Sequence, residues 1–585
     1  MSTNLETPVE LDPAAIADHA SMQAFLNCYL RETGAGVVES ADAVPVETVA
    51  DRVVRVSLDQ QGLTLYAPFE YESPTGRHCF AGFFYEGENG TLPLDAHTLV
   101  ALCVKELSLS RDGDPGELTH RATLSRRAIE RFVRERDDDV TKPAATFSEA
   151  EQSLLFGHLM HPTPKSRQGM GDNPTFAPEL RGSFQLHYAR VVPELTEDYA
   201  ALSHSASDWV KADLAATGYE SLVDTDDVFV PLHPRQADYL ERQPDVEEQV
   251  AAGTIEFLGP FGREFYPTTS VRTLYAPDAP FMVKTSLPVR ITNSLRTNTR
   301  EELPRGVAVA DLLDTEVGDE LNQTFPDFDI IRDPASLTVT FGEGESGFET
   351  VLRENPFPGD PERVTPLVAL CQDAPSGATD SRLGRLIREI AARESRSTDA
   401  VSKEWFCEYL SRSVRPALWL YLEQGLGVEA HQQNSVLALD EAGYPDTFYY
   451  RDNQGYYLPE SKQAAVESVL PDAAERLGTC CPDEVADERL RYYLILNNAF
   501  GLVNAFGCAG LCNERDLLSI LREGLEHCRA FDHDDSSLLT DLLESPTLPC
   551  KANLLTRFHD MDELVGSLEN QSVYTDIDNP LVVGE

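Results

Sequence analysis

Residues 281–298 read FMVKTSLPVRITNSLRTN and set the pattern for the middle of the chain. The stretch begins as an apolar β-strand, FMVKT, and continues with serine and threonine hydroxyls between basic side chains. Similar strand-like runs recur from Gln185 to about Phe341, among them DVFVPLHP, TIEFLGPF and SLTVTF. The sequence therefore predicts a β-rich unit built around residues 281–298.

The segments on either side of this unit have different patterns. Residues 1–147 mix short strands with a helix, LDAHTLVALCVKEL, whereas residues 382–585 are mainly helical, as in RLGRLIREIAARES. A chain of 585 residues is too long for one hydrophobic core, because domains usually hold about 100–200 residues. Length alone therefore predicts about three to five units, and the three patterns divide this α+β chain at residues 1–147, 148–381 and 382–585.

The chain is strongly acidic, with a formal net charge of -50 from 98 acidic and 48 basic residues. A field this negative repels nucleic acid and anionic membranes, so neither is an expected partner. Acidic residues spread along the whole chain are typical of adaptation to high salt, which screens their repulsion. No apolar run approaches the roughly 20 residues that span a bilayer, and the N-terminus lacks a signal sequence. Eleven scattered cysteines suit a reducing compartment, so we expect a cytoplasmic protein.

The segment HPTPKSRQG concentrates basic residues within this acidic background. It contains His161, Lys165 and Arg167. A helix is expected to precede it, with a capping box formed by Ser148 and Glu151. The helix dipole favours one cation at a helix C-terminus, but it does not explain a run of them with two prolines and a glycine. The segment is therefore a candidate anion site.

A second candidate anion site lies in TTSVRTLYA. It contains Ser270, Arg272 and Thr273, and Lys284 follows twelve residues after Arg272. If the segment is a strand, Ser270 and Arg272 share one face. Arg offers bidentate hydrogen bonds to carboxylate or phosphate and Lys offers a point charge, so these residues resemble an anion cradle.

Two polar motifs flank a predicted β-hairpin, NSVLALDEAGYPDTFYYRD, with its turn at EAGYPD. EAHQQN precedes the first strand and contains His431 and Asn434, and RDNQG follows the second strand and contains Asp452. Antiparallel pairing brings these residues together. An amide oxygen beside a carboxylate suits Mg²⁺, which completes its coordination with phosphate oxygens and water.

Familiar nucleotide and metal motifs are missing or weak. There is no GxxxxGK[ST] loop, and GEGESG has glutamates where a pyrophosphate would approach. CAGLC has no second pair at zinc-like spacing, so we interpret Cys508 and Cys512 as core or interface residues. The motifs together offer cations for a polyphosphate, a pair of Mg²⁺ ligands, and further Arg and His for a second anion. This combination predicts nucleotide-dependent activation of a carboxylate.

These motifs resemble the IucA/IucC family, the NRPS-independent siderophore synthetases. HPTPKSRQG, HPRQ, SVRT, KTSLPVRITNSLR and EAHQQN followed by RD stand in the family's order and spacing, and KANLLTR near the C-terminus also matches. The family often has HPWQ where this chain has HPRQ, and GHPxHP where it has GHLMHP. The resemblance implies a cupped-hand architecture with a thumb, β-rich fingers and a mainly helical palm.

The resemblance also implies an acid–amine ligase of siderophore biosynthesis that uses ATP and Mg²⁺. Such an enzyme adenylates a carboxylate of citrate or a citrate monoamide, and an amine or N-hydroxylated diamine then attacks to form an amide. The residues implied to hold the ATP phosphates are His161, Lys165, Arg167, Ser270, Arg272, Thr273 and Lys284. Asn434 and Asp452 are implied to hold the metal. The carboxylate substrate is implied to be held by Thr292, Arg296, His431 and Lys551.

Two other functions would use the same side chains. A phosphotransferase would need them for γ-phosphoryl transfer and would release ADP instead of AMP and pyrophosphate. A non-catalytic binder of citrate-type siderophores would consume no ATP, although a carboxylate binder has no need of a Mg²⁺ pair. Family members are often dimers, so a homodimer is a further expectation.

Overall fold

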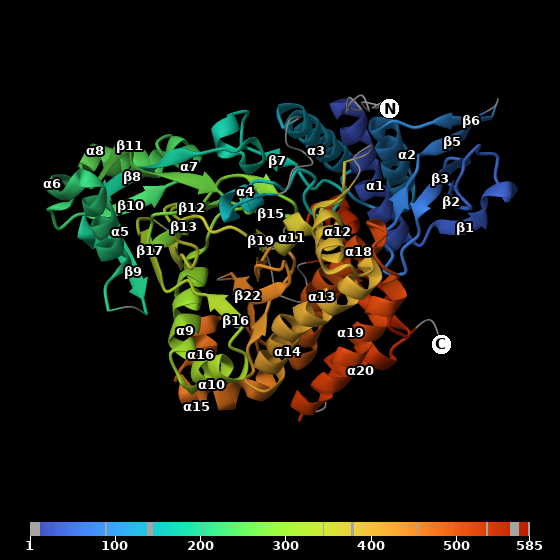
Figure 1. Cartoon of the computed structure of the whole chain (residues 1–585). Helices are drawn as coiled ribbons and strands as arrows, with labels where there is room; N and C mark the ends of the chain where they lie inside the picture. Colours follow the sequence, from blue (N-terminus) through green and yellow to red (C-terminus); the bar gives the residue numbers. More distant parts are fainter. Residues whose placement is uncertain are drawn as a thin grey trace, which may run out of the picture.

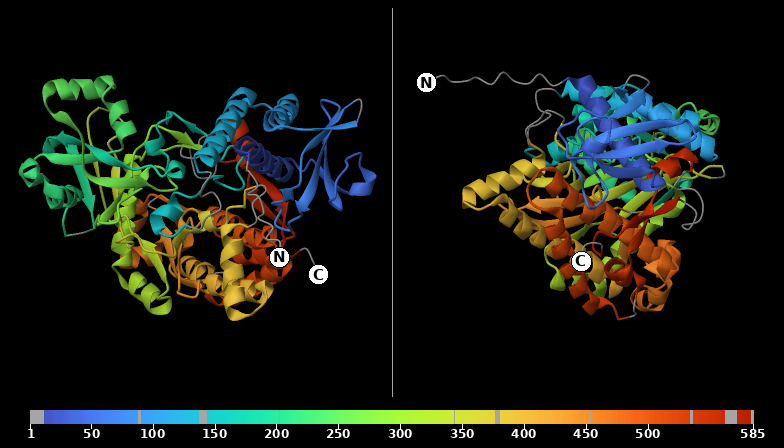
Figure 2. Two further views of the ribbon diagram at one scale, coloured as in Figure 1. Left: turned by 45° about the horizontal axis from the view of Figure 1, so that its top comes forward. Right: turned by 90° about the vertical axis from the view of Figure 1, so that its right-hand side faces the viewer.

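The protein has three parts, which Figure 1 distinguishes by colour in a computed structural model. The structure describes residues 12–87, 90–136, 144–201, 203–342, 344–375, 380–452, 454–533, 536–561 and 572–582. The N-terminal part (blue) and the β-rich middle part (green) lie on the right and left above the largely helical C-terminal part (yellow to red), an arrangement that Figure 2 shows from two further sides. Among the residues described, none of the helices combines the length and the apolar character that crossing a bilayer requires.

The N-terminal part packs three helices with one sheet. The strand order is β1-β2-β3-β5-β6, and β4 pairs with β3. The strands are β1 (Gly36–Ser40), β2 (Arg52–Leu58), β3 (Leu63–Tyr71), β4 (Cys79–Phe80), β5 (Phe84–Gly87) and β6 (Gly90–Pro93). The helices are α1 (Pro13–Thr33), α2 (Ala96–Ser110) and α3 (Pro115–Glu135). An aspartate side chain accepts a free backbone N–H at the start of each helix, which explains where the helices begin: Asp12, Asp95 and Asp114.

The middle part is an antiparallel sheet of eight described strands in the order β10-β8-β11-β12-β13-β18-β17-β9. These strands are β8 (Phe184–Val191), β9 (Thr196–Ala200), β10 (Val228–Leu232), β11 (Ile255–Pro267), β12 (Thr273–Tyr275), β13 (Phe281–Thr285), β17 (Ala335–Val339) and β18 (Thr350–Glu354). Four helices accompany the sheet: α5 (Ala206–Leu214), α6 (Glu220–Val223), α7 (Pro234–Leu240) and α8 (Pro244–Ala252). Thr273 of β12 lies opposite Lys284 of β13, so the strand register brings two predicted ATP-binding residues side by side.

A small sheet joins HPTPKSRQG to the 281–298 stretch. It consists of β7 (Arg167–Gln168), β14 (Arg290–Ile291) and β15 (Ser294–Leu295), with Arg167 opposite Ile291. Gly169 has a φ of +94°, and a Cβ there would lie 2.7 Å from the Pro288 carbonyl oxygen. Only glycine fits this close approach of two backbones.

The C-terminal part consists mainly of helices. They include α12 (Arg382–Glu394), α13 (Thr398–Arg412), α14 (Val414–Leu422), α15 (Gln463–Val469), α16 (Ala473–Leu477), α17 (Asp483–Leu490), α18 (Phe500–Cys508), α19 (Glu514–Cys528), α20 (Ser537–Glu544) and α21 (Asn553–Phe558). A π-helical segment, Arg491–Ala499, joins α17 to α18. The strands are β19 (Val364–Pro366), β20 (Gly427–Val428), β21 (Ser435–Leu439), β22 (Pro445–Arg451), β23 (Tyr456–Pro459), β24 (Cys480–Cys481), β25 (Thr547–Lys551) and β26 (Tyr574–Asp578). The antiparallel pairing of β21 with β22 confirms the predicted hairpin.

The three expected domains exchange segments, and their boundaries at 147/148 and 381/382 stay predictions. From the middle of the chain, α9 (Leu303–Leu313), α10 (Glu316–Thr324) and β16 (Phe328–Ile331) pack into the core of the helical part. α11 (Leu367–Leu370) joins the same core, and at the other end of the chain α21 packs into the core of the N-terminal part. The chain thus crosses between its three parts several times, and each crossing packs one part against another.

The expected helix after a Ser148–Glu151 capping box is wrong. The helix there, α4, spans only Phe147–Glu151, and its N-cap is Thr146. The Ser148 side chain instead donates a hydrogen bond to Asp360. The glycine and prolines of GHLMHPTP follow at once, and proline cannot continue a helix because it lacks the N–H donor. HPTPKSRQG is therefore carried by a loop.

Candidate functional site

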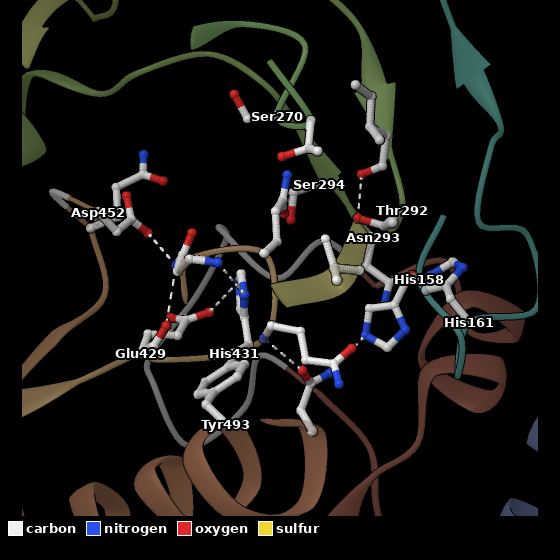
Figure 3. Close-up of a pocket in the computed structure, with 18 of the residues that line it drawn as sticks. His158, His161, Ser270, Thr292, Asn293, Ser294, Glu429, His431, Asp452 and Tyr493 are labelled. Carbon is white, nitrogen blue, oxygen red and sulfur yellow. Dashed lines mark hydrogen bonds and ion pairs between the residues drawn. The ribbon is translucent and has the colours of Figure 1, made fainter. Parts of the chain in front are cut away.

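One cleft contains every side chain that the sequence predicts to be functional. Its cavity volume is about 650 Å³, and its wall draws on all three parts of the chain. Figure 3 shows side chains of the β-rich part, such as Ser270 and Thr292, facing Glu429, His431 and Tyr493 of the helical part. The predicted residues in its wall are His161, Lys165, Arg167, Ser270, Arg272, Thr273, Lys284, Thr292, Arg296, His431, Asn434, Asp452 and Lys551.

A strained turn carries Ser270 and Arg272. The prediction that they share a strand face is wrong, because both lie between the end of β11 and the start of β12. Val271 between them has a φ of +70°, a left-handed conformation that is strained for a β-branched residue. The Ser270 hydroxyl accepts the Thr273 N–H at 3.0 Å and lies 3.2 Å from the Thr268 hydroxyl. Such strain is often found where a backbone is fixed for binding.

Arg272 keeps its positive charge at the wall of the cleft. It is only 4% exposed and donates to two neutral amide oxygens, of Asn298 at 3.0 Å and Gln454 at 2.9 Å. Burial, followed by the charge of Arg296, lowers the pKa of Arg272 to about 10. The guanidinium therefore stays protonated near neutral pH, oriented by amides that do not neutralise it.

Lys284 and Asp452 form a buried ion pair beside Asn434. Lys284 Nζ lies 2.9 Å from one Asp452 carboxylate oxygen, and Asn434 Nδ2 lies 3.4 Å from the other. Burial lowers the pKa of Lys284 to about 8 despite the carboxylate. Burial alone would raise the pKa of Asp452, but Lys284 and Arg353 outweigh it and hold that pKa well below its usual range. The hairpin brings Asn434 and Asp452 together as predicted, since Arg451 N–H bonds to the Asn434 carbonyl at 3.0 Å.

Glu429 is a site residue that the sequence reasoning missed. It lines the same cleft, and burial followed by the negative charge of Asp452 raises its pKa to about 7. Its only signal in the sequence is its place as the first residue of EAHQQN. Two nearby carboxylates repel each other when both are ionised, and a cation between them removes that repulsion, so these residues fit a divalent metal ion with oxygen ligands.

A second strained residue, Thr292, lies at the opposite wall. Its φ is +53°, and its hydroxyl accepts a hydrogen bond from Arg296 Nη2 at 2.7 Å. Arg121 of α3 reaches it from the N-terminal part and donates to the Thr292 carbonyl at 2.7 Å. Burial, followed by the charge of Arg557, lowers the pKa of Arg121 to about 9. Sequence reasoning missed Arg121, because nothing in an amphipathic helix marks one of several arginines as buried.

The basic residues of HPTPKSRQG share a buried counterion. Lys165 Nζ and Arg167 Nη2 both contact the same carboxylate oxygen of Glu179, which is 2% exposed. Burial alone would raise the pKa of Glu179, but the two cations outweigh it and hold the pKa at about 2. Burial lowers the pKa of Lys165 to about 8. The structure thus neutralises part of the charge that the sequence pattern assigned to a ligand.

The two histidines of the predicted site are neutral near pH 7. Burial lowers the pKa of His161 well below its usual value, and His161 Nε2 faces the Asn293 side-chain oxygen at 3.1 Å. Burial likewise lowers the pKa of His431 to about 4, and its Nδ1 accepts the Asn434 N–H at 3.2 Å. Both therefore act as polar donors rather than as cations.

Lys551 supplies the cation beside His431. Its ammonium lies 3.3 Å from the Tyr493 hydroxyl and 5.9 Å from the centre of the Tyr492 ring. Both tyrosines come from the π-helical segment, a type of helix that is often found at functional sites. A ligand carboxylate that reached this corner would find an ammonium, a tyrosine hydroxyl and a neutral imidazole.

HPRQ lies outside the cleft and supports it from behind. His233 is fully buried and caps α7 by accepting the Arg235 N–H at 3.0 Å. Arg235 Nε donates to the Gly169 carbonyl at 2.8 Å. The arginine of HPRQ therefore holds the end of the HPTPKSRQG loop.

Fold and cleft together define an α+β protein with a large polar cleft for anionic ligands, beside a pair of groups suited to a divalent cation. Residues 146–372 match the IucA/IucC family, and residues 403–566 match a family described as ferric iron reductase FhuF-like transporter. A spermidine-citrate ligase of Bacillus anthracis is 42% identical over 97% of this chain and 98% of its own length. The rhizobactin siderophore biosynthesis protein RhbC of Rhizobium meliloti is 38% identical over 96% of this chain and 97% of its own. The chain belongs to the IucA/IucC family of siderophore synthetases, as its motifs predicted.

A solved structure supports the same assignment. The ATP-bound aerobactin synthetase IucA from Klebsiella pneumoniae superposes with a TM-score of 0.86 at 28% identity, over 97% of this chain and all of that one. The predicted α+β fold is therefore confirmed.

Proposed function

We propose that this protein is an ATP-dependent ligase that joins citrate to an amine in siderophore biosynthesis. One observation carries the proposal: thirteen side chains chosen from separate sequence motifs line a single cleft. Relatives that match nearly the whole chain are named for the same reaction type, including spermidine-citrate ligase and L-2,3-diaminopropanoate–citrate ligase. The residues of the cleft and the names of the relatives thus both support an acid–amine ligase.

ATP is the activating substrate in this proposal, and its phosphates contact Ser270, Arg272, Thr273 and Lys284, with Lys165, Arg167 and His161 farther along the wall. A citrate carboxylate attacks the α-phosphorus, so a P–O bond forms while the bond to pyrophosphate breaks. Two anions repel each other in this step. Preorganised cations such as Arg272 and Lys284 offset that repulsion and stabilise the charge that develops on the phosphorus.

Mg²⁺ completes the proposed site, with Asn434 and Asp452 as ligands and Glu429 nearby. A bound Mg²⁺ would neutralise phosphate charge and orient the triphosphate. Contacts within the protein hold the Asp452 carboxylate and the Asn434 amide in place before a ligand binds. Lys284 holds one Asp452 oxygen, which leaves the other facing Asn434.

The carboxylate substrate is proposed to be free citrate, held by Thr292, Arg296, His431 and Lys551. Several relatives that cover nearly all of this chain are named for citrate itself, whereas a relative named for an already substituted citrate is 23% identical over 61% of the chain. The amine then attacks the citryl carbonyl, an amide bond forms, and AMP leaves with its electron pair. The amine class best supported by similarity is a polyamine such as spermidine.

The remaining expectations are retained as part of the proposal. The enzyme would act in the cytoplasm, where ATP is available, as a homodimer and without a nucleic-acid partner. The phosphotransferase and the non-catalytic binder are less well supported, because the relatives covering the whole chain are named as ligases or synthetases.

The proposal is tested by incubating the full-length protein with ATP, Mg²⁺, citrate and spermidine in molar KCl. We expect AMP and a citryl-spermidine amide, identified by mass, in equal amounts. ADP as the nucleotide product would instead identify a phosphotransferase. Citrate binding without nucleotide turnover, with any amine tested, would identify a binder.

A further inference from the structure

A second cleft adjoins the first. It has a cavity volume of about 730 Å³ and shares Arg77, His158 and Leu159 with the wall of the proposed active site. Its own wall includes four cysteines, among them Cys79 and Cys508. Both residues are partly exposed and line this cleft, which opens a route from solution to the pair.

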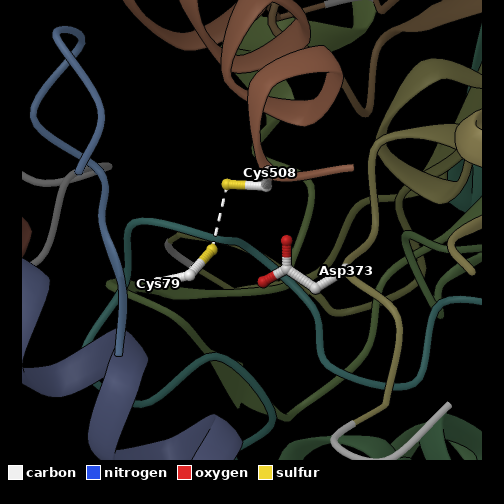
Figure 4. Close-up of side chains that lie close together, drawn as sticks. All are labelled: Cys79, Asp373 and Cys508. Atoms are coloured by element: carbon white, nitrogen blue, oxygen red, sulfur yellow. Dashed lines mark hydrogen bonds between the residues drawn. The ribbon is translucent and has the colours of Figure 1, made fainter. Parts of the chain in front are cut away.

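The two thiols come from distant parts of the chain and touch each other. Cys79 lies in β4 of the N-terminal part, and Cys508 ends α18 of the helical part. Figure 4 shows the two sulfur atoms pointing at one another, and they lie 3.0 Å apart. A disulfide bond is about 2.05 Å long, so each sulfur needs to move by only about half an ångström to form one.

A metal ion fits the same place less well. Asp373 is close enough to complete a three-ligand set with the two cysteines. Its carboxylate, however, already accepts hydrogen bonds from Arg77 Nη1 and Nη2 and from Gln23 Nε2. The Arg77 cation would also repel an incoming divalent ion.

We propose that Cys79 and Cys508 form a site of reversible covalent oxidation, a disulfide that cross-links the N-terminal part to α18. The oxidant is a small disulfide of the glutathione class. One cysteine thiolate attacks it, forms a mixed disulfide and releases one thiol; the second cysteine then attacks the mixed disulfide, closes the cross-link and releases the second thiol. Two protons leave the protein, and two electrons reduce the oxidant.

The local environment sets how this site behaves. The adjacent Cys79 thiol, followed by burial, raises the pKa of Cys508 well above its usual value. Cross-linking is therefore slow near neutral pH and accelerates as the pH rises, because the thiolate is the attacking form. In a reducing cytoplasm the pair stays reduced until the glutathione pool becomes oxidised.

The cross-link also reaches the active cleft. Arg77, two residues before Cys79, donates to the Asn504 side-chain oxygen at 2.7 Å, and both residues line that cleft. Closing the disulfide fixes the two segments that carry them. The resulting change in citrate or amine affinity rests on the proposed function, whereas the cross-link itself does not.

The test uses the full-length protein equilibrated with reduced and oxidised glutathione at graded ratios, then alkylated and mapped by peptide mass. We expect one linked peptide pair containing Cys79 and Cys508, two mass units lighter than the two free peptides together, with the other nine cysteines alkylated. Dithiothreitol should restore both free thiols. Formation should be at least tenfold faster at pH 9 than at pH 7.

Matched variants keep the result interpretable. Cys79→Ser and Cys508→Ser should each abolish the cross-link, whereas Cys512→Ser, which removes another cysteine of the same cleft, should leave it intact. The proposal is overturned if both thiols remain alkylatable at the most oxidising ratio while exposed Cys407 acquires glutathione. Stoichiometric Zn²⁺ binding that protects the pair from alkylation and is lost in Asp373→Asn would also overturn it, in favour of a metal site. The cross-link can succeed or fail here whatever the ligase assay gives.

Discussion

Lys284 in β13 and Lys165 in HPTPKSRQG are both buried lysines paired with a carboxylate, yet their surroundings differ. The carboxylate partner of Lys284, Asp452, itself lines the cleft and faces Asn434. The partner of Lys165, Glu179, is 2% exposed and stands behind the wall, where it also holds Arg167. The Lys284–Asp452 pair therefore faces the space that a ligand would occupy. The charge of Lys165 is largely neutralised by a carboxylate inside the protein. A cluster of cations in a sequence therefore overstates the charge that a ligand meets.

Glu179→Gln should give the largest effect, because it leaves two buried cations without their counterion. We expect a loss of about 3–5 kcal/mol in the free energy of unfolding, measured by urea denaturation. Glu135→Gln is the matched control, since it breaks an ion pair with Arg131 in which both side chains are substantially exposed, and it should cost under ~1 kcal/mol. Equal losses in the two variants would remove the distinction between the two lysine sites.

Arg272→Ala should lower the rate of AMP formation by about 10²–10³, because the cation no longer stabilises charge on the α-phosphate. Lys284→Met should have a similar effect. The fold should be retained, as judged by thermal unfolding. Wild-type turnover in either variant would contradict the assignment of these residues to the phosphate site.

Lys165→Met should be milder than Lys284→Met. We expect the KM for ATP to rise about tenfold with little change in kcat, since Glu179 already neutralises part of the charge. A loss of kcat as large as that of Lys284→Met, in protein shown to be folded, would mean that Lys165 acts directly on the reacting phosphate.

Activity should fall as the pH rises above about 8, by up to tenfold per pH unit, because burial lowers the pKa of Lys284 to about 8. Stability should change in the opposite direction. Between about pH 8 and 10.4 the unfolded lysine keeps a proton that the folded lysine has lost, so the contribution of this group to stability rises with pH. A pH profile of kcat/KM beside urea denaturation at the same pH values measures both. Parallel losses of activity and stability would contradict the assignment.

Arg121→Met should have the smallest effect, a rise of about fivefold in the KM for citrate, equivalent to the loss of one hydrogen bond of about 1 kcal/mol at the Thr292 backbone. The KM for ATP should stay unchanged. Arg131→Met on the same helix is the control and should alter neither constant. A matching rise in both KM values would point to general loosening of the fold instead of a positioning role.

Sequence patterns predicted the architecture and most residues of the candidate site, because periodicity and motif order can be read from the chain locally. The predicted hairpin between EAHQQN and RDNQG is enough to place Asn434 beside Asp452. What the sequence did not contain is the set of contacts between distant segments. Glu179 pairs with Lys165, and Arg121 donates to the Thr292 carbonyl. No rule of sequence spacing predicts either contact.

The errors have the same origin. Ser148 and Glu151 match a capping box, but Asp360 takes the Ser148 hydroxyl. TTSVRT reads as a strand, yet Val271 adopts a left-handed turn that the surrounding packing enforces. In both cases tertiary contacts outweighed a local preference worth about 1 kcal/mol.

The central claim is that this cleft adenylates citrate, and trapping with hydroxylamine tests it most directly. The protein would be incubated with ATP, Mg²⁺ and hydroxylamine in molar KCl, with citrate, 2-oxoglutarate or succinate supplied separately. We predict a hydroxamate with citrate alone, formed together with equal AMP, and none from Arg272→Ala. No hydroxamate and no AMP with citrate, from protein that is folded, would contradict the account.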